Sequence, residues 1–253
     1  MARLAALALV WGSSFLLIKV GLRGLTPSQL VLTRLVFGAG VLLVVVVARR
    51  LSLPTDWRMW GHLTVLAVTA NVVPFVLFAW GEQHISSGLA GILNATTPLL
   101  TVIIAVVVLP DERASFLRAV GVAIGFAGVV LIIAPWHSGG AGSLAGELAC
   151  LGAAACYGVA FTYTRRFVSG RGSPLALATG QLGAAAVLQI FVTLAAHEPS
   201  PHLTTKVVAA AIALGAVNTG LAYLLYYSLI RDIGATSTAM VTYLMPIVAV
   251  GLG

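Results

Sequence analysis

Nine apolar stretches follow one another along this 253-residue chain, with only short polar loops between them. Hydrophobic residues make up 60% of the sequence and charged residues 8%, and the mean hydropathy is +1.05. A soluble domain carries roughly 25% charged residues, so this chain could not cover a surface in water. A helix of about 20 apolar residues crosses the bilayer core. The sequence therefore predicts nine membrane spans, approximately 4–22, 28–48, 61–82, 85–108, 117–135, 144–164, 174–196, 205–229 and 235–253.

The boundaries of these stretches favour helices over any other membrane-spanning structure. Proline and small polar residues mark most ends, as at Pro27, Pro54 and Pro174. The first stretch has the length of a signal peptide, but Trp11, Lys19 and the lack of a small-residue cleavage site argue against one. We predict an all-α integral membrane protein whose loops are too short to hold a soluble domain.

The chain also repeats itself. Three pairs of segments match at offsets of 146, 147 and 148 residues, so only single-residue insertions separate the copies. This regularity predicts a duplicated module, with a first half over 1–137 and a second over 138–253. The matched pairs are Trp11-Gly12 with Tyr157-Gly158, Ser28 to Arg34 with Leu175 to Gln181, and Asn94 to Pro98 with Thr242 to Pro246.

The basic residues predict how the module is oriented. If the N-terminus is cytoplasmic, ten arginines fall on the inner side, three basic residues fall on the outer side, and Arg34 lies within a span. The net charge of +7 then reflects topology, and we expect no nucleic-acid partner. Five spans in the first half force the second half to enter upside down. The inner arginines are 3, 49, 50, 58, 113, 118, 165, 166, 171 and 231, and the outer basic residues are Lys19, Arg23 and Lys206.

The second copy is shorter than the first. Only Ile247 to Gly253 follow Pro246, whereas the first copy continues for a further helix after Pro98. We therefore expect about nine helices of a ten-helix fold, and we interpret the chain as a fragment lacking the last one.

A series of motifs runs along the chain: Trp11-Gly-Ser-Ser-Phe15 with Lys19, Thr26-Pro27, Arg34, Asn94-Ala-Thr-Thr-Pro98-Leu, Asp111-Glu112, and Gly121 through Gly128. Together these motifs resemble an EamA-type member of the drug/metabolite transporter superfamily. The resemblance covers essentially the whole chain, and it implies ten helices in two inverted five-helix repeats with both termini cytoplasmic. It also implies the outward movement of small metabolites, often amino acids. The basic inner loops are typical of a protein of a bacterial-type cell (inner) membrane.

Prolines inside the spans indicate where a solute could bind. Pro98 and Pro246 hold equivalent positions, and each frees the carbonyl four residues earlier, on Asn94 and Thr242. Pro74 does the same to the carbonyl of Ala70. In hydrocarbon such a carbonyl must face protein, water or a ligand. The alternative is that these prolines only kink their helices for packing.

Polar residues at membrane depth complete a candidate substrate site suited to a zwitterion or an amphipathic metabolite. Tyrosine and tryptophan offer apolar faces with one polar group, and asparagine both donates and accepts. A single Ser or Thr more commonly bonds to its own helix backbone. The candidate substrate-binding residues are Trp11, Ser14, Asn71, Asn94, Thr97, Tyr157, Tyr163, Asn218, Tyr223 and Thr242.

Two basic residues have both a structural and a functional interpretation. Lys19 lies near the outer end of its span, and we expect it to extend to the headgroups. Arg34 lies about seven residues beyond Pro27, where a charge is costly and usually paired. We favour a structural Arg34 that caps carbonyls over one that contacts a substrate carboxylate.

No acidic residue is expected at the middle of a span, although proton-coupled carriers commonly place one in the pathway. We therefore expect movement or exchange driven by the solute gradient. Glu82 and Glu147, at the outer ends of spans, are the alternative proton sites.

Enzymatic function finds no support in the sequence. Cys150 and Cys156 lie six residues apart on one predicted helix without metal-ligand spacing, and no pair of histidines forms a metalloprotease motif. We expect no catalytic residue, no metal and no cofactor, and the expected partners are a small-molecule substrate, the lipid bilayer and possibly a second copy of the chain. The sequence favours efflux by alternating access, and the alternative is a membrane scaffold or a channel-like pore.

Overall fold

The computed structural model describes residues 2–109, 116–133, 141–234, 238 and 241–252, and these form helices and turns with no strand among them. The predicted all-α fold is confirmed. The predicted boundary between the halves, at residues 137 and 138, lies outside the described residues, as does the Asp111-Glu112 pair.

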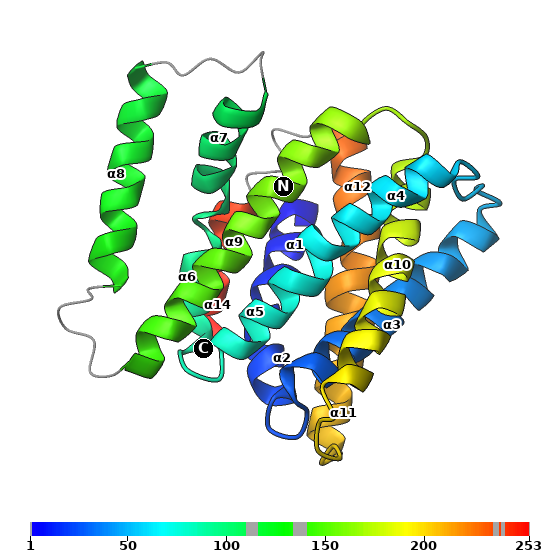
Figure 1. Ribbon diagram of the computed structural model, residues 1–253, viewed down its shortest axis with the longest axis horizontal. Coiled ribbons are helices and arrows are strands. Elements are labelled where there is room, and N and C mark those ends of the chain that lie inside the picture. The colour runs from blue at the N-terminus through cyan, green and yellow to red at the C-terminus, as the bar shows by residue number, and fades with distance from the viewer. Residues whose placement is uncertain (1, 110–115, 134–140, 235–237, 239–240, 253) are drawn as a thin grey trace.

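The helices before residue 134 follow the first five predicted spans (Figure 1). Several spans consist of more than one element. The elements are α1 (Ala2–Gly12), α2 (Ser14–Gly21), α3 (Pro27–Ala48), α4 (Trp57–Ala67), η1 (Val68–Val72), α5 (Val73–Gly81), α6 (Ser87–Asn94), α7 (Thr97–Val108) and α8 (Phe116–Ile133).

The helices after residue 140 follow the other four predicted spans. The elements are α9 (Ala141–Phe167), α10 (Pro174–Ala195), α11 (Thr205–Ile212), η2 (Ala213–Leu221), α12 (Ala222–Ile233) and α14 (Val241–Leu252).

Seven helical stretches among the described residues are long and apolar enough to cross a membrane, and Val241–Leu252 is a shorter apolar helix. The chain is therefore a multi-pass membrane protein. The seven stretches are Ala2–Gly21, Pro27–Ala48, Trp57–Gly81, Ser87–Val108, Leu144–Phe167, Pro174–Ala195 and Thr205–Ile233.

Two of these stretches contain wider, π-helical turns, at η1 and η2. Pro74 follows η1 and has no N–H, so it cannot continue the regular hydrogen-bond ladder. In η2 the Thr219 hydroxyl donates to the carbonyl of Leu214, five residues earlier, at 3.0 Å. The repeat offset of 147 relates residues 68–72 of η1 to residues 215–219 of η2. The third span of the first half and its counterpart in the second half therefore both contain a π-helical segment. Such bulges are frequent at functional sites.

The fourth span is broken just before Pro98, whereas its counterpart continues through Pro246. α6 ends at Asn94, a turn follows, and α7 begins at Thr97 with Pro98 in its first turn. Pro246 instead lies inside α14, which continues through it. The paired prolines therefore interrupt only one of the two equivalent spans.

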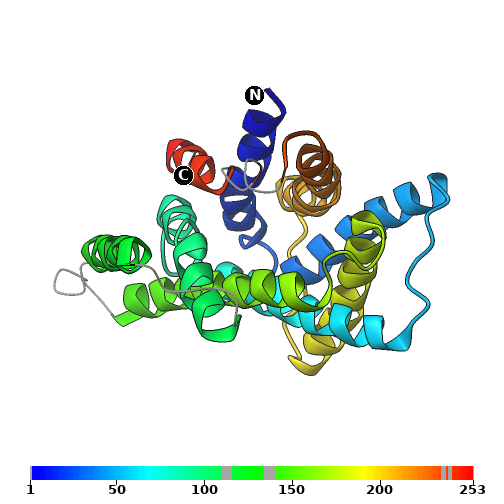
Figure 2. The same ribbon diagram turned by 90° about the horizontal axis from the view of Figure 1, so that it is seen from above.

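Helices from the two halves of the sequence pack against each other throughout the bundle. α3 lies between α10 and η2, and α1 lies beside both α12 and α14 (Figures 1 and 2). At one edge of the molecule α8 lies beside α7, where Gly125 faces Leu99 (Figure 1). Because the halves are interleaved, the middle of the bundle is lined by residues from both.

Small residues allow α3 and η2 to approach closely. A Cβ atom on Gly38 would lie 2.8 Å from the Thr219 side chain, and one on Gly220 would lie 2.6 Å from the Val41 side chain. Small residues permit such backbone approach between membrane helices. This contact holds the middle of α3 against the second half.

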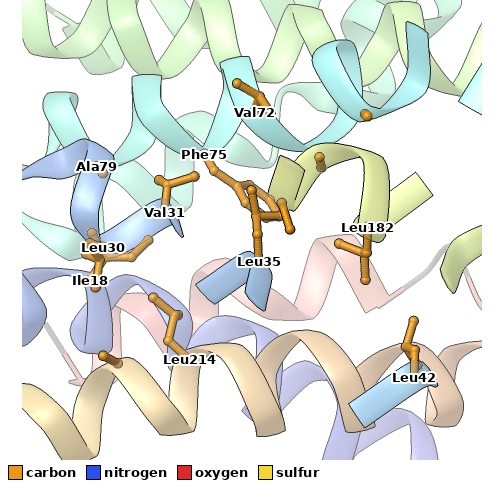
Figure 3. Packing of buried hydrophobic residues seen from close by; sticks show 14 of the residues in the cluster. Ile18, Leu30, Val31, Leu35, Leu42, Val72, Phe75, Ala79, Leu182 and Leu214 are labelled. Atoms are coloured by element: carbon orange, nitrogen blue, oxygen red, sulfur yellow. The ribbon is translucent and has the colours of Figure 1, made fainter. Parts of the chain in front are cut away.

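The largest apolar cluster surrounds this contact. Leu35 and Leu42 of α3, Leu182 of α10 and Leu214 of η2 are fully buried, and Phe75 of α5 packs among them (Figure 3). Apolar packing in this cluster therefore fixes α3, α5, α10 and η2 relative to one another.

Candidate substrate site

Arg34 and Thr219 join the two halves at the centre of the bundle. The Arg34 Nε donates to the Thr219 hydroxyl at 3.0 Å, and the guanidinium carbon lies 3.7 Å from the centroid of the Phe75 ring. No hydrogen bond from Arg34 to a backbone carbonyl occurs among the described residues. The prediction that Arg34 caps carbonyls is therefore wrong for the described part of the chain, because a hydroxyl and an aromatic ring hold the side chain instead.

Asn71 and Gln181 form a second polar contact between the halves. The Gln181 Nε2 donates to the Asn71 Oδ1 at 2.6 Å, and Asn71 is fully buried in η1. The Asn71 Nδ2 makes no hydrogen bond of standard geometry among the described residues, although the Tyr223 side chain lies close enough to interact with the amide. A buried donor without a well-placed acceptor is costly, so this amide is a candidate substrate contact.

The repeat relates these two contacts. An offset of 147 places Gln181 at the position of Arg34, and it places Asn218, next to Thr219, at the position of Asn71. The second span of each half thus bonds to the π-helical segment of the other half. Sequence reasoning left out Gln181, Thr219 and Phe75, although Gln181 could have been found as the counterpart of Arg34.

Asn218 ties η2 to the junction of α1 and α2. Its Nδ2 donates to the Val10 carbonyl and lies 3.1 Å from the hydroxyl oxygens of both Ser13 and Ser14. Ser14 is buried, and the nearby Trp11 ring packs 5.3 Å from that of Tyr226. Three of the predicted substrate-binding residues, Trp11, Ser14 and Asn218, therefore lie close together.

Asn94 and Thr97 flank the break in the fourth span. Both are buried, and the Thr97 hydroxyl donates to the Asn94 carbonyl at 2.7 Å. That carbonyl is the one that Pro98 deprives of its helical partner, so the protein itself satisfies it. The prediction that a Ser or Thr bonds to its own helix is confirmed at Thr162, which donates to the Gly158 carbonyl, whereas the Thr97 bond crosses the break between α6 and α7.

The remaining predicted residues do not all join this centre. Tyr157 stacks on Phe78 at 6.1 Å and lies within electrostatic reach of Arg34. Tyr163 lies in a separate cluster, where its hydroxyl is 2.8 Å from the His62 Nδ1. Thr242 lies on α14 and is half-buried. A groove of about 490 Å³ between α3, α4 and α10 contains none of the predicted residues, and its lining is mainly apolar.

Glu82 lies just beyond the end of α5 and is fully buried. Its Oε2 accepts from the Ser87 hydroxyl at 3.0 Å, while its Oε1 has no hydrogen-bond partner among the described residues. Lys19 does not extend freely to the headgroups as expected, because its Nζ donates to the backbone carbonyls of Glu82 and Ile85. The carboxyl therefore lacks a salt bridge within the described part of the chain.

Burial of Glu82 should make stability depend on pH. Glu82 follows the span Trp57–Gly81, and burial raises the pKa of its carboxyl from 4.5 to about 8, against the opposing effects of Ser87, Lys19 and Arg34. The folded chain then binds a proton that the unfolded chain releases, so stability falls as the pH rises from about 4.5 to about 8, by at most about 1.4 kcal/mol per unit. Thermal unfolding in detergent should show this decline, and Glu82→Gln should flatten it. A wild-type profile that rises over this range would contradict the prediction.

Known proteins support the membrane-transport interpretation. The family model described as the EamA-like transporter family matches residues 2–134 and 144–253. The chain is 22% identical over 254 residues to a Bacillus subtilis (strain 168) protein named uncharacterized transporter YoaV, which covers 100% of this chain and 87% of that protein. It is 28% identical over 255 residues to the uncharacterized inner membrane transporter YedA of Escherichia coli (strain K12), covering 99% and 80% of the two chains.

A further sequence relative and a solved structure are also similar to this chain. The uncharacterized transporter YdfC of Bacillus subtilis (strain 168) is 30% identical over 163 residues, and the match spans 63% of this chain and about half, 51%, of that protein. A chain of a solved crystal structure shares the fold with a TM-score of 0.64 at 20% identity, covering 99% of this chain and 94% of that one. The family match extends over nearly the whole sequence, and this chain belongs to the EamA-like transporter family.

Proposed function

We propose that this protein is a carrier that exports amino acids or related amphipathic metabolites by alternating access. The observation that supports this most strongly is the pair of reciprocal contacts, Arg34 with Thr219 and Gln181 with Asn71. Each contact joins one half of the sequence to the π-helical segment of the other half. Two halves that meet through equivalent polar contacts can rock about them and open a central site to each side in turn.

The proposed architecture is two inverted five-helix repeats, residues 1–137 and 138–253, of which this chain holds about nine helices. The matching family segments at 2–134 and 144–253 favour this division. The arginine bias favours a cytoplasmic N-terminus, and the resemblance to an inner membrane transporter favours the cell (inner) membrane. In this arrangement the site lies near the midplane, between the repeats.

Saturable uptake into proteoliposomes tests the carrier proposal. The chain is reconstituted, and initial rates are measured for a panel of labelled amino acids at increasing concentration. We expect at least one amino acid to enter with a saturating rate. Absence of flux across the whole panel would contradict the amino-acid proposal and favour another solute class or the scaffold.

Asn94 provides a first test of the site. Its buried amide lies at the end of α6, next to the break before α7. Asn94→Ala should lower the saturable rate at least tenfold, because one hydrogen bond to a charged group is worth about 1.5–3 kcal/mol. A matched control is Thr64→Ala, since Thr64 is exposed and bonds only to its own helix backbone. Equal rates in both variants would place the substrate away from Asn94.

A further inference from the structure

Arg34 is the one described cation well inside a predicted span, seven residues beyond Pro27, and one of its nitrogens is held in place. Nε donates to Thr219, whose hydroxyl in turn donates to the Leu214 carbonyl. The guanidinium carbon lies over the Phe75 ring, 3.7 Å from its centroid. A hydroxyl and a ring thus orient the planar group before any solute arrives.

The two terminal nitrogens of Arg34 remain available. Guanidinium carries five N–H donors, and the four on these nitrogens make no hydrogen bond to any described residue. No described carboxylate lies within 4.0 Å of them, and Glu82 acts on Arg34 only at longer range. Because a charge at the centre of a bilayer costs at least about 2.5–3.5 kcal/mol, such a residue normally has a partner.

We propose that Arg34 binds the carboxylate group of the transported solute through its terminal nitrogens. The planar fork of arginine matches the two oxygens of a carboxylate, whereas a spherical anion uses only part of it. Phe75 lies directly at the group, and Tyr157 and Tyr223 lie within electrostatic reach. These rings suit the apolar body of an organic acid or an amino acid.

Only one of the two repeats provides an arginine at this position. Gln181 holds the equivalent position in the second half, and its amide is neutral and already bonded to Asn71. The duplicated architecture therefore offers one carboxylate-binding group rather than two. This inference rests on the proposed carrier function and narrows its substrates to solutes that carry a carboxylate.

Direct binding tests the inference without requiring transport. The full chain is placed in lipid nanodiscs, and the affinities for benzoate and for benzamide are compared by calorimetric titration. These probes share a ring and differ in charge. The wild type should bind benzoate roughly tenfold or more tightly than benzamide, because hydrogen bonds to charged groups are the stronger ones.

Four variants assign that preference to Arg34. Arg34→Gln should abolish it and Arg34→Lys should reduce it, because lysine keeps the charge but loses the fork. Thr219→Val removes the hydroxyl with little change in shape and should also reduce the preference, whereas Thr219→Ser should keep it. Arg171→Gln, at an exposed loop position, controls for the loss of one charge.

The outcomes separate the site from the function. Equal binding of the two probes by the wild type, absence of benzoate binding, or a preference unchanged in both Arg34→Gln and Thr219→Val would overturn the carboxylate site. A clear preference without flux of any amino acid would uphold the site and contradict the proposed amino-acid carrier. Saturable flux without a preference would uphold the carrier and contradict the site.

Discussion

Asn218→Ala should reduce amino-acid exchange at least tenfold while leaving most of the folded protein intact. The Asn218 amide bonds to the Val10 carbonyl and contacts Ser13 and Ser14, so it alone connects η2 to the junction of α1 and α2 by side-chain hydrogen bonds within the described residues. Hydrogen bonds between membrane helices contribute on average only about 0.6 kcal/mol, and the bundle should tolerate the loss. Transport is more sensitive than folding, because the Asn218 amide and the serines that it contacts belong to the candidate substrate site and must keep their positions for the solute to bind.

Initial exchange rates in proteoliposomes measure this effect, with thermal unfolding in detergent as the test of folding. Asn218→Asp replaces the donating nitrogen with oxygen at almost constant size, and it should be as inactive as Asn218→Ala. If Asn218→Asp exchanges at the wild-type rate, the donor is not needed and the role assigned to this junction is wrong.

Gly215→Ala should destabilise the protein by about 1–3 kcal/mol, the usual cost of overpacking. A Cβ atom at this position would lie 2.6 Å from the Phe37 Cβ and 2.9 Å from the backbone oxygen of Arg34. A backbone atom cannot rotate away as a side chain can, so α3 and η2 would have to separate. Their separation would also lengthen the contact between Arg34 and Thr219, and the exchange rate should fall with the stability.

Gly40→Ala is the matched control, since Gly40 lies on α3 and its Cβ atom would meet nothing within 4 Å. Alanine is the better helix former, so this variant should be neutral or more stable by about 0.5–1 kcal/mol. Thermal midpoints of the purified variants give the comparison. Equal midpoints for the two variants would show that α3 and η2 do not depend on this close approach.

The sequence predicts the spans well because membrane helices must satisfy their own backbone and therefore leave a strong apolar pattern. Each of the nine predicted stretches coincides with helix in the described residues. The missing N–H of Pro98 predicts a freed Asn94 carbonyl or a kink, and the structure shows a full break between α6 and α7. Its counterpart at Pro246 was not interrupted, since a proline can also lie inside a packed helix, and the choice depends on neighbours that the sequence does not specify.

The candidate site was predicted only in part. Asn94 and Asn218 stand out in the sequence because a buried amide needs several partners. In the structure Asn218 and Asn71 lie in π-helical segments between the halves, whereas Asn94 ends α6. Tyr163 is equally polar but lies in another cluster, with His62. The residue type and its depth in the membrane do not show whether a polar side chain faces the centre of the bundle. That direction depends on how each helix is rotated about its axis. The repeat holds further information, because it makes Gln181 the counterpart of Arg34. The contacts of these two residues with Asn71 and Thr219 are visible only in the structure.

Counterflow in proteoliposomes tests the central claim, that the two halves form a carrier with alternating access. Vesicles loaded with an unlabelled amino acid that the protein transports are diluted into a low concentration of the same compound carrying a label. A carrier should accumulate the label transiently, and the accumulation should disappear in Asn218→Ala. Entry of label that only equilibrates, with no dependence on the compound inside, would show a pore and would contradict alternating access.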